Sequence, residues 1–323
     1  MTAEPSPTAT ALVALMKLKG VGRRAALRLV SDLGQGTDRS VYRETVISKA
    51  RQARMPASEL MSAWAKSEEQ LEQGSAAGIQ TFSFHDDEYP ERLRRISDPP
   101  AVLFVKGDVN SLHAAKSIAV VGTREPTPYG AKVARKSART ATEAGFVIVS
   151  GLALGCDTYA HEGCLEGHGI GIAVLAHGLD RVYPASNRDL AERLLESGGC
   201  LVSEYPIEMR PARAAFAERD RIQSGLSDGV LVIETDVKGG TMHTVRFSRE
   251  QRRPLACIDH PESWLGEEKT KGNQKLIEDG WATPIPDGNT LERFLDQISR
   301  DRSEEPDSRL DLEPEERQRS WNF

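Results

Sequence analysis

Residues 147–161, VIVSGLALGCDTYAH, decide the fold class of this chain. The stretch begins with a run dominated by β-branched apolar side chains, which is typical of a strand buried on both faces of a parallel sheet. Glycines at 151 and 155 follow the run, and Asp157 and Thr158 stand where a helix N-cap is expected. A strand, a glycine loop and a capped helix start predict an open α/β sheet with an anion pocket at its carboxyl edge.

The same pattern recurs along the chain. Further apolar runs that end in small or polar residues occupy residues 117–121, 169–176, 200–203 and 229–233. Helix-like segments separate these runs. This order of elements predicts a Rossmann-like, doubly wound and mostly parallel sheet whose functional loops share one edge. Residues 79–112 are expected to lead into the sheet rather than to form a separate domain.

Composition limits the classes of function. The chain has 323 residues, 39% of them hydrophobic, with a mean hydropathy of -0.45 and a formal net charge of -6. No apolar stretch approaches the ~20 residues that span a bilayer. The first residues lack the basic start and apolar core of a signal peptide. We therefore expect a cytoplasmic protein without a membrane partner.

Motifs for a bound cofactor or metal ion are missing from the sequence. There is neither a G-K-[ST] phosphate loop nor a G-x-G-x-x-G fingerprint, so we expect no cofactor. The four cysteines lack the paired spacing of zinc sites. Cys156, His161, Cys164 and His168 could be suggested as metal ligands, but buried thiols and a pocket-lining histidine are the favoured interpretation. We expect no metal ion and no disulfide.

The N-terminal segment is helical in pattern and basic in character. Two helix-like stretches, 11–19 and 23–30, are joined by a Gly-Val-Gly turn and resemble a helix-hairpin-helix. Glycines in such a turn let backbone N–H groups approach a phosphate. Basic residues outnumber acidic ones between positions 17 and 54, so DNA contact is one interpretation, and a protein-interaction module is the other. The residues expected to make this secondary DNA contact are Lys19, Gly20, Gly22, Arg23 and Arg24.

These patterns divide the chain into three parts. Residues 1–78 are expected to form a small all-α domain of the helix-hairpin-helix or SAM-like kind, with its first ten residues disordered. Residues 79–300 are expected to form the Rossmann-like domain. Residues 301–323 are rich in acidic side chains and poor in apolar ones, which predicts a disordered acidic tail.

Several motifs in a fixed order resemble the DNA-processing protein A family (DprA, also called Smf). They are FHDDEYPERLRRISDPPAVLF, VVGTREPTPYG, SGLALGCDTYAH, LAHGLDRVYPASNRDL, SEYP and FAERDRIQSGLSDGVLVIE, and they lie between residues 80 and 258. The resemblance implies a Rossmann-like domain that binds single-stranded DNA. It also implies a homodimer that hands the strand to a RecA-type recombinase during natural transformation, a form of DNA recombination.

The resemblance and the loop pattern together imply one binding face. Arg124 follows an expected strand at the start of a helix, a position that suits bidentate contact with a phosphate. The residues expected to contact DNA or its phosphates are Gly122, Thr123, Arg124, Ser150, Gly151, Asp157, His161, Gly178, Tyr183, Asn187, Arg188, Arg219, Arg221, Gly240 and Thr241.

The chain departs from the family pattern near these residues. Leu154 stands where the family usually has Arg, Asp220 where it has Asn, and Ala185 where a basic residue is frequent. These differences make the expected pocket less cationic. A sensor of a nucleotide or a nucleotide-derived signal, including one in phage defence, is therefore the alternative function.

A nucleotide-processing hydrolase is a third interpretation. Asp157, Glu204 and Glu234 follow expected strands, where catalytic groups would lie. The phosphoribohydrolases on this sheet type carry a glutamate after their glycine motif, whereas Val245 and Arg246 stand at the corresponding positions here. We therefore expect a binding protein without catalytic residues.

Overall fold

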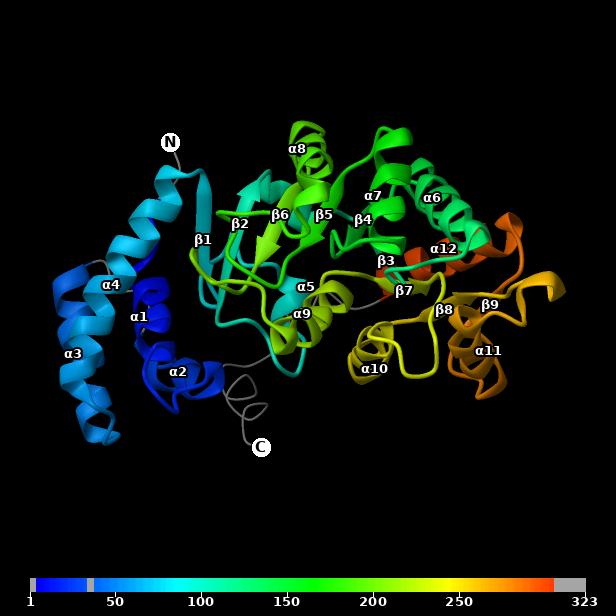
Figure 1. Cartoon of the computed structure of the whole chain (residues 1–323). Coiled ribbons are helices and arrows are strands. Elements are labelled where there is room, and N and C mark those ends of the chain that lie inside the picture. Colours follow the sequence, from blue (N-terminus) through cyan, green and yellow to red (C-terminus); the bar gives the residue numbers. More distant parts are fainter. Residues whose placement is uncertain (1–3, 34–37, 305–323) are drawn as a thin grey trace.

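The structure is a computed structural model that describes residues 4–33 and 38–304. Within these residues nine strands form a single sheet in the order β1-β2-β6-β5-β4-β3-β7-β8-β9 (Figure 1). The pairs β1–β2 and β2–β6 are antiparallel and the other pairs are parallel, which confirms the mostly parallel α/β sheet. The strands are β1 Ile79–Ser83, β2 Val102–Gly107, β3 Ser117–Val121, β4 Val147–Ser150, β5 Gly171–Val174, β6 Cys200–Ser203, β7 Gly229–Val232, β8 Leu255–Ile258 and β9 Thr283–Ile285.

The apolar runs of the sequence coincide with strands of the sheet. β3, β4 and β6 have the bounds of their runs, whereas β5 is shorter than the run at 169–176. Its pairing with β4 begins at Gly171, opposite Ile148, and the strand ends at Val174. The expected lead-in at 79–112 supplies β1 and β2, which extend the sheet beyond β6.

Helices cover both faces of the sheet, as in a doubly wound fold (Figure 1). Ile118 and Val120 of β3 belong to the buried cluster that α6, α7 and α12 share, whereas Ala119 and Val121 belong to the cluster with α9 and α10. This alternation follows from the two-residue period of a strand. The helices are α5 Glu91–Arg94, α6 Pro128–Glu143, α7 Cys156–Glu166, α8 Arg188–Glu196, α9 Arg213–Gly225, α10 Thr241–Glu250, α11 Lys271–Glu278 and α12 Gly288–Glu304.

In the described part of the chain, four helices precede the sheet. α1 packs against α4 and β1, and Leu12, Leu15 and Trp64 lie in the same buried cluster as Phe104 of β2. The apolar core therefore runs from these helices into the sheet without a break. The helices are α1 Pro7–Met16, α2 Arg23–Val30, α3 Arg39–Gln52 and α4 Ala57–Ala76.

The expectation that the first ten residues are disordered is wrong from Pro7 onward. Pro7 occupies the first turn of α1, and the Ser6 hydroxyl caps the helix by accepting a hydrogen bond from the Ala9 N–H at 3.1 Å. Thr8 is buried, and its hydroxyl donates to the Tyr42 hydroxyl at 3.1 Å. A segment rich in Pro and Thr is therefore compatible with a buried helix when the proline stands at the helix start.

At the other end of the chain, α12 continues to Glu304, past the expected start of the acidic tail at 301. Phe294, Leu295 and Ile298 anchor this helix in the core. The rest of the expected tail, 305–323, lies outside the described residues. No described helix is both long enough and apolar enough to span a membrane.

A buried ion pair fixes α9 to the end of β6. Arg221 is 2% exposed, and its Nη1 and Nη2 each donate to one carboxylate oxygen of Glu204 at 2.6 Å. Its Nε donates to the Asp98 carbonyl oxygen at 2.8 Å. Arg23 of α2 binds the Asp98 carboxylate and lies 3.4 Å from Glu218 of α9. The network therefore joins α2, α9 and the sheet.

Replacing Glu204 with Gln is expected to lower the free energy of unfolding by about 3–5 kcal/mol, because the buried Arg221 charge loses its counter-ion. Urea denaturation at neutral pH measures this loss. Glu218→Gln is the matched control: this side chain is 48% exposed, and such a pair contributes at most about 1 kcal/mol. Equal losses in the two variants would contradict a special role for the buried pair.

Candidate functional site

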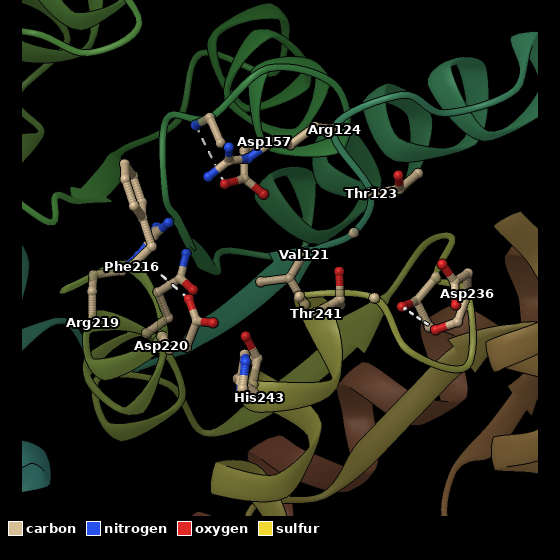
Figure 2. Close-up of a pocket in the computed structure, with 18 of the residues that line it drawn as sticks. Val121, Thr123, Arg124, Asp157, Phe216, Arg219, Asp220, Asp236, Thr241 and His243 are labelled. Atoms are coloured by element: carbon tan, nitrogen blue, oxygen red, sulfur yellow. Dashed lines mark hydrogen bonds and ion pairs between the residues drawn. The ribbon is translucent and has the colours of Figure 1, made fainter. Parts of the chain in front are cut away.

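The sheet reverses its winding at β3. From β3 the chain proceeds through β4 and β5 to β6 on one side, and then β7, β8 and β9 follow on the other side. In open α/β sheets, ligands bind beyond the carboxyl ends of the strands at such a switch point. A pocket of about 790 Å³ lies there, between α9 and the loops that follow β3, β4 and β7 (Figure 2). The residues that line it are Val121, Gly122, Thr123, Arg124, Glu125, Ala153, Asp157, Arg213, Phe216, Ala217, Arg219, Asp220, Gln223, Thr235, Asp236, Lys238, Gly239, Gly240, Thr241, His243, Thr244 and Lys269.

Asp157 organises the loop that follows β4. It lies in the first turn of α7 rather than at the expected N-cap position, which Gly155 takes with a φ of 78°. Its Oδ2 accepts the N–H groups of Gly151 and Ala153 at 3.2 and 3.3 Å. Burial raises the pKa of the Asp157 carboxyl group, and the positive charge of Arg219 opposes the rise. Asp157 is therefore a fixed part of the pocket wall.

Arg219 lies on the pocket floor against Gly151. A Cβ on Gly151 would come within 1.5 Å of Arg219 Nη1, so a glycine is needed for the guanidinium group to fit. Nη1 donates to the Val174 carbonyl oxygen at 3.0 Å, and Nε lies 3.3 Å from Asp220 Oδ1. Gln223, with its amide oriented to suit its neighbours, accepts from Arg219 Nη1 at 2.9 Å and from the Gly151 N–H at 2.8 Å. These contacts join β4, β5 and α9 in one hydrogen-bonded floor.

Asp220 is a second carboxyl group in the pocket. Its Oδ1 accepts from the Gln223 amide at 3.1 Å in addition to its contact with Arg219. Burial raises the pKa of Asp220 to about 7; Arg219 opposes the rise, and Asp157 adds to it. Near neutral pH this carboxyl group is therefore divided between its neutral and its ionised form.

Arg124 and Phe216 form the rim of the pocket, and Tyr183 lies beside Phe216 just outside the lining. The exposed guanidinium group of Arg124 lies over the half-buried Phe216 ring, 5.0 Å from the ring centroid. Tyr183 is 48% exposed, and its ring centroid is 6.0 Å from that of Phe216. The rim therefore offers a cation and an aromatic surface to a ligand.

Glu234 anchors the loop that carries Arg124. Its Oε2 accepts the Thr127 N–H at 2.8 Å, and its Oε1 accepts the Thr127 hydroxyl at 2.6 Å. His260 Nε2 lies 3.5 Å from the same Oε1, and both side chains are buried. Glu234 and Glu204, two of the carboxylates considered for hydrolysis, are thus both engaged in contacts within the protein.

The pocket brings together many of the residues expected to contact DNA. Three expected residues lie outside the pocket. Asn187 is buried and donates from Nδ2 to the Leu152 carbonyl oxygen at 2.9 Å. Gly178 packs against the Pro206 carbonyl group, and Arg188 is exposed at the start of α8. The expected residues that line the pocket or its floor are Gly122, Thr123, Arg124, Gly151, Asp157, Arg219, Gly240 and Thr241.

Three expected contact residues face the protein interior, which corrects their assignment. Ser150 is buried, and its hydroxyl donates to the Val120 carbonyl oxygen at 2.7 Å. His161 is fully buried, and burial lowers its pKa to about 3, so its ring is neutral. Arg221 is paired with Glu204. Residues two positions apart on a helix point in different directions, so Arg221 faces away from the pocket that Arg219 of the same helix lines.

Of the five residues expected to make the secondary DNA contact at the N-terminal hairpin, one is paired within the protein and four are exposed. Arg23 is paired with Asp98 and its side chain is 24% exposed, so part of its charge is balanced within the protein. Lys19, Gly20 and Gly22 are exposed. Arg24 lies 3.3 Å from Asp98 but is 71% exposed. Gly20, Gly22, Lys19 and Arg24 thus form the accessible part of the hairpin.

The metal ligands considered from the sequence do not converge. Cys156, His161 and Cys164 are buried, whereas His168 is exposed beyond the end of α7. Among the described residues no group of His, Cys, Asp and Glu is placed to hold a metal ion.

Phe216 and Gln223 are pocket residues that the expected set omits. A helical period could have found them, because Phe216, Arg219, Asp220 and Gln223 recur at the spacing of one helix face. His243 also lines the pocket, but no motif in the sequence marks it.

Comparison with known proteins gives consistent matches. The family model for DNA recombination-mediator protein A matches residues 80–297. Protein Smf of Escherichia coli is 40% identical over 192 residues, which are 59% of this chain and 50% of that protein. DNA processing protein DprA of Bacillus subtilis is 39% identical over 203 residues, which are 63% of this chain and 67% of that protein. The matched segment thus spans one half to two thirds of these relatives.

Two solved structures are similar to this one. DNA processing protein A from Streptococcus pneumoniae has a TM-score of 0.70 at 28% identity, covering 89% of this chain and 95% of that chain. DNA processing protein A from Helicobacter pylori, described for its single-stranded DNA binding mode, has a TM-score of 0.60 at 29% identity, covering 69% of this chain and 96% of that chain. Because the family model matches more than half of the chain and both structures share its fold, this chain belongs to the DNA recombination-mediator protein A family.

Proposed function

We propose that this chain binds single-stranded DNA through the pocket at the switch point and delivers the strand to a RecA-type recombinase. The observation that carries the proposal is that Arg124, Phe216 and Arg219 line one pocket, with the exposed Tyr183 ring beside Phe216. A guanidinium group is suited to a phosphate. An aromatic ring stacks on an unpaired base, which a duplex keeps inside.

Backbone groups support a phosphate contact. α10 begins at Thr241 directly after Gly240, and no side chain caps it. The N–H groups at an uncapped helix start attract anions. Arg213, Lys238 and Lys269 add positive charge to the lining of the pocket.

The similar proteins also support the proposal that this chain binds single-stranded DNA. The H. pylori structure concerns single-stranded DNA binding, and the family is named for mediating recombination. A mediator that holds a single strand is placed to pass it to the recombinase, so we include the RecA-type partner. We also propose that the chain acts as a homodimer in the cytoplasm during natural transformation, as the resemblance implies.

The N-terminal helices are proposed to make a secondary contact with the strand. Glu218 of α9 lies 3.4 Å from Arg23, so the start of α2 adjoins the helix that carries Phe216. Lys19 and Arg24 are exposed there. We propose that residues 1–78 act as the helical domain that extends the phosphate track beyond the pocket.

A nucleotide-signal sensor is the second candidate function. The pocket volume of about 790 Å³ lies within the range of roughly 300–1,000 Å³ for small-molecule sites. Asp157 and Asp220 also reduce its positive charge. Both functions use the same pocket, so binding measurements separate them.

The full-length chain is expected to bind an oligo-dT strand more tightly than a duplex of equal length, because only the strand offers unpaired bases to the aromatic rim. Fluorescence anisotropy across a salt series measures this, with affinity falling by about 0.7 log units per log of salt concentration for each phosphate neutralised. Equal affinity for both forms would contradict the single-strand mode. Tight binding of a mononucleotide without binding of oligo-dT would favour the sensor.

Arg124→Ala is expected to weaken oligo-dT binding by about 1.5–3 kcal/mol, since it removes a charge-assisted phosphate contact. The melting temperature should stay the same because Arg124 is exposed. Arg139→Ala is the matched control: Arg139 is 55% exposed on α6 and pairs with Glu143 of the same helix at 2.7 Å. If both variants bind as the unmodified chain does, Arg124 has no part in the site.

A further inference from the structure

Asp220 is an acidic group in a pocket proposed to bind anions. Its side chain is 13% exposed and lines the pocket from α9 (Figure 2). The Gln223 amide group donates a hydrogen bond to its Oδ1 at 3.1 Å, and Arg219 Nε lies 3.3 Å from the same oxygen as an ion pair. Among the described residues, no hydrogen bond or ion pair reaches Oδ2. One oxygen is thus fixed, and the other is left to carry a proton.

Asp220 has both attractive and repulsive charges around it. Burial raises its pKa to about 7; Arg219 opposes the rise and Asp157 adds to it. Asp157 cannot turn away, because its carboxylate accepts two backbone N–H groups. The charged groups whose fields reach Asp220 are Arg219 of α9, Asp157 of α7 and Arg124 after β3. The other charged or titratable side chains that line the same pocket are Glu125, Arg213, Asp236, Lys238, His243 and Lys269.

The two protonation states of Asp220 present different pockets to a phosphate. An ionised Asp220 offsets the Arg219 charge and repels an entering phosphate. A protonated Asp220 no longer offsets the Arg219 charge, so that only Asp157 still does so, and its hydroxyl becomes a hydrogen-bond donor. A phosphate in the pocket therefore favours the protonated form, and the protonated form favours the phosphate.

We propose that Asp220 is a specificity-determining residue that couples phosphate binding to proton uptake: a strand phosphate that enters the pocket is accompanied by at most one proton, which is taken up by the fraction of Asp220 that was ionised beforehand. The proton comes from solvent and settles on the Asp220 carboxyl group; no covalent bond to the strand forms or breaks. This inference rests on the proposed function, since it concerns the same pocket and the same ligand.

Full-length protein titrated with oligo-dT at constant ionic strength tests the inference. Between pH 6 and pH 8 the Kd is expected to rise by roughly tenfold, and by no more than tenfold per pH unit for one proton. Asp220→Asn keeps the shape of the group but cannot ionise. This variant is expected to bind as tightly at pH 8 as the unmodified chain does at pH 6, with a flat pH profile.

Two control variants isolate the effect. His243→Gln replaces the histidine that lines the same pocket, and the variant is expected to keep the pH dependence of Kd. Asp296→Asn removes an exposed acid on α12, on the opposite face of the sheet from α9, and is expected to change nothing. A slope that persists in Asp220→Asn, or that vanishes in His243→Gln, overturns the inference.

Thermal unfolding gives a readout that needs no DNA. A carboxyl group whose pKa is raised by folding contributes stability below its unfolded pKa, and this contribution is lost as the pH rises through about 7. Asp220→Asn should therefore melt at a higher temperature than the unmodified chain at pH 8, with the difference shrinking toward acid pH. A pH-independent difference overturns the inference. Loss of oligo-dT binding at every pH, with this melting pattern intact, overturns the proposed function and the DNA coupling while leaving the Asp220 titration established.

Discussion

The contact between Arg219 and Gly151 is the constraint on which the pocket depends. The guanidinium group lies where any larger residue after β4 would place its Cβ. Its bond to the Val174 carbonyl oxygen also holds α9 to β5. α9 therefore brings Phe216 and Asp220 to the edge of the sheet, although it follows β4 by some sixty residues in the chain. In this structure the Arg219 guanidinium group occupies the space that a side chain at position 151 would need.

Acidic side chains lower the positive potential of this pocket. Its cations come from the rim and the floor, but Asp157 and Asp220 lie beside Arg219. Buried acids next to a binding cation limit non-selective attraction to anions, because part of the positive potential is cancelled. Affinity must then come from several modest contacts, including base stacking, rather than from one strong charge.

The sheet could be predicted from the sequence, but the site only in part. β3, β4 and β6 are apolar runs bounded by small or polar residues, and such runs are local signals. Arg219 and Arg221 look alike in the sequence, yet one lines the pocket and the other is paired with Glu204. Their difference is set by the rotation of α9 against the sheet, a tertiary property that no local pattern contains.

The position of Arg124 has a kinetic consequence. Its guanidinium group lies over the Phe216 ring, on the surface where the proposed strand would stack a base. In the proposed binding mode, a strand would draw this guanidinium group away before the ring becomes available. Association should therefore be ordered, with capture of the backbone first and stacking second. The lifetime of the complex would then depend on the stacking step, whereas the association rate would depend on capture of the backbone. A substitution could therefore change one of these two quantities without changing the other.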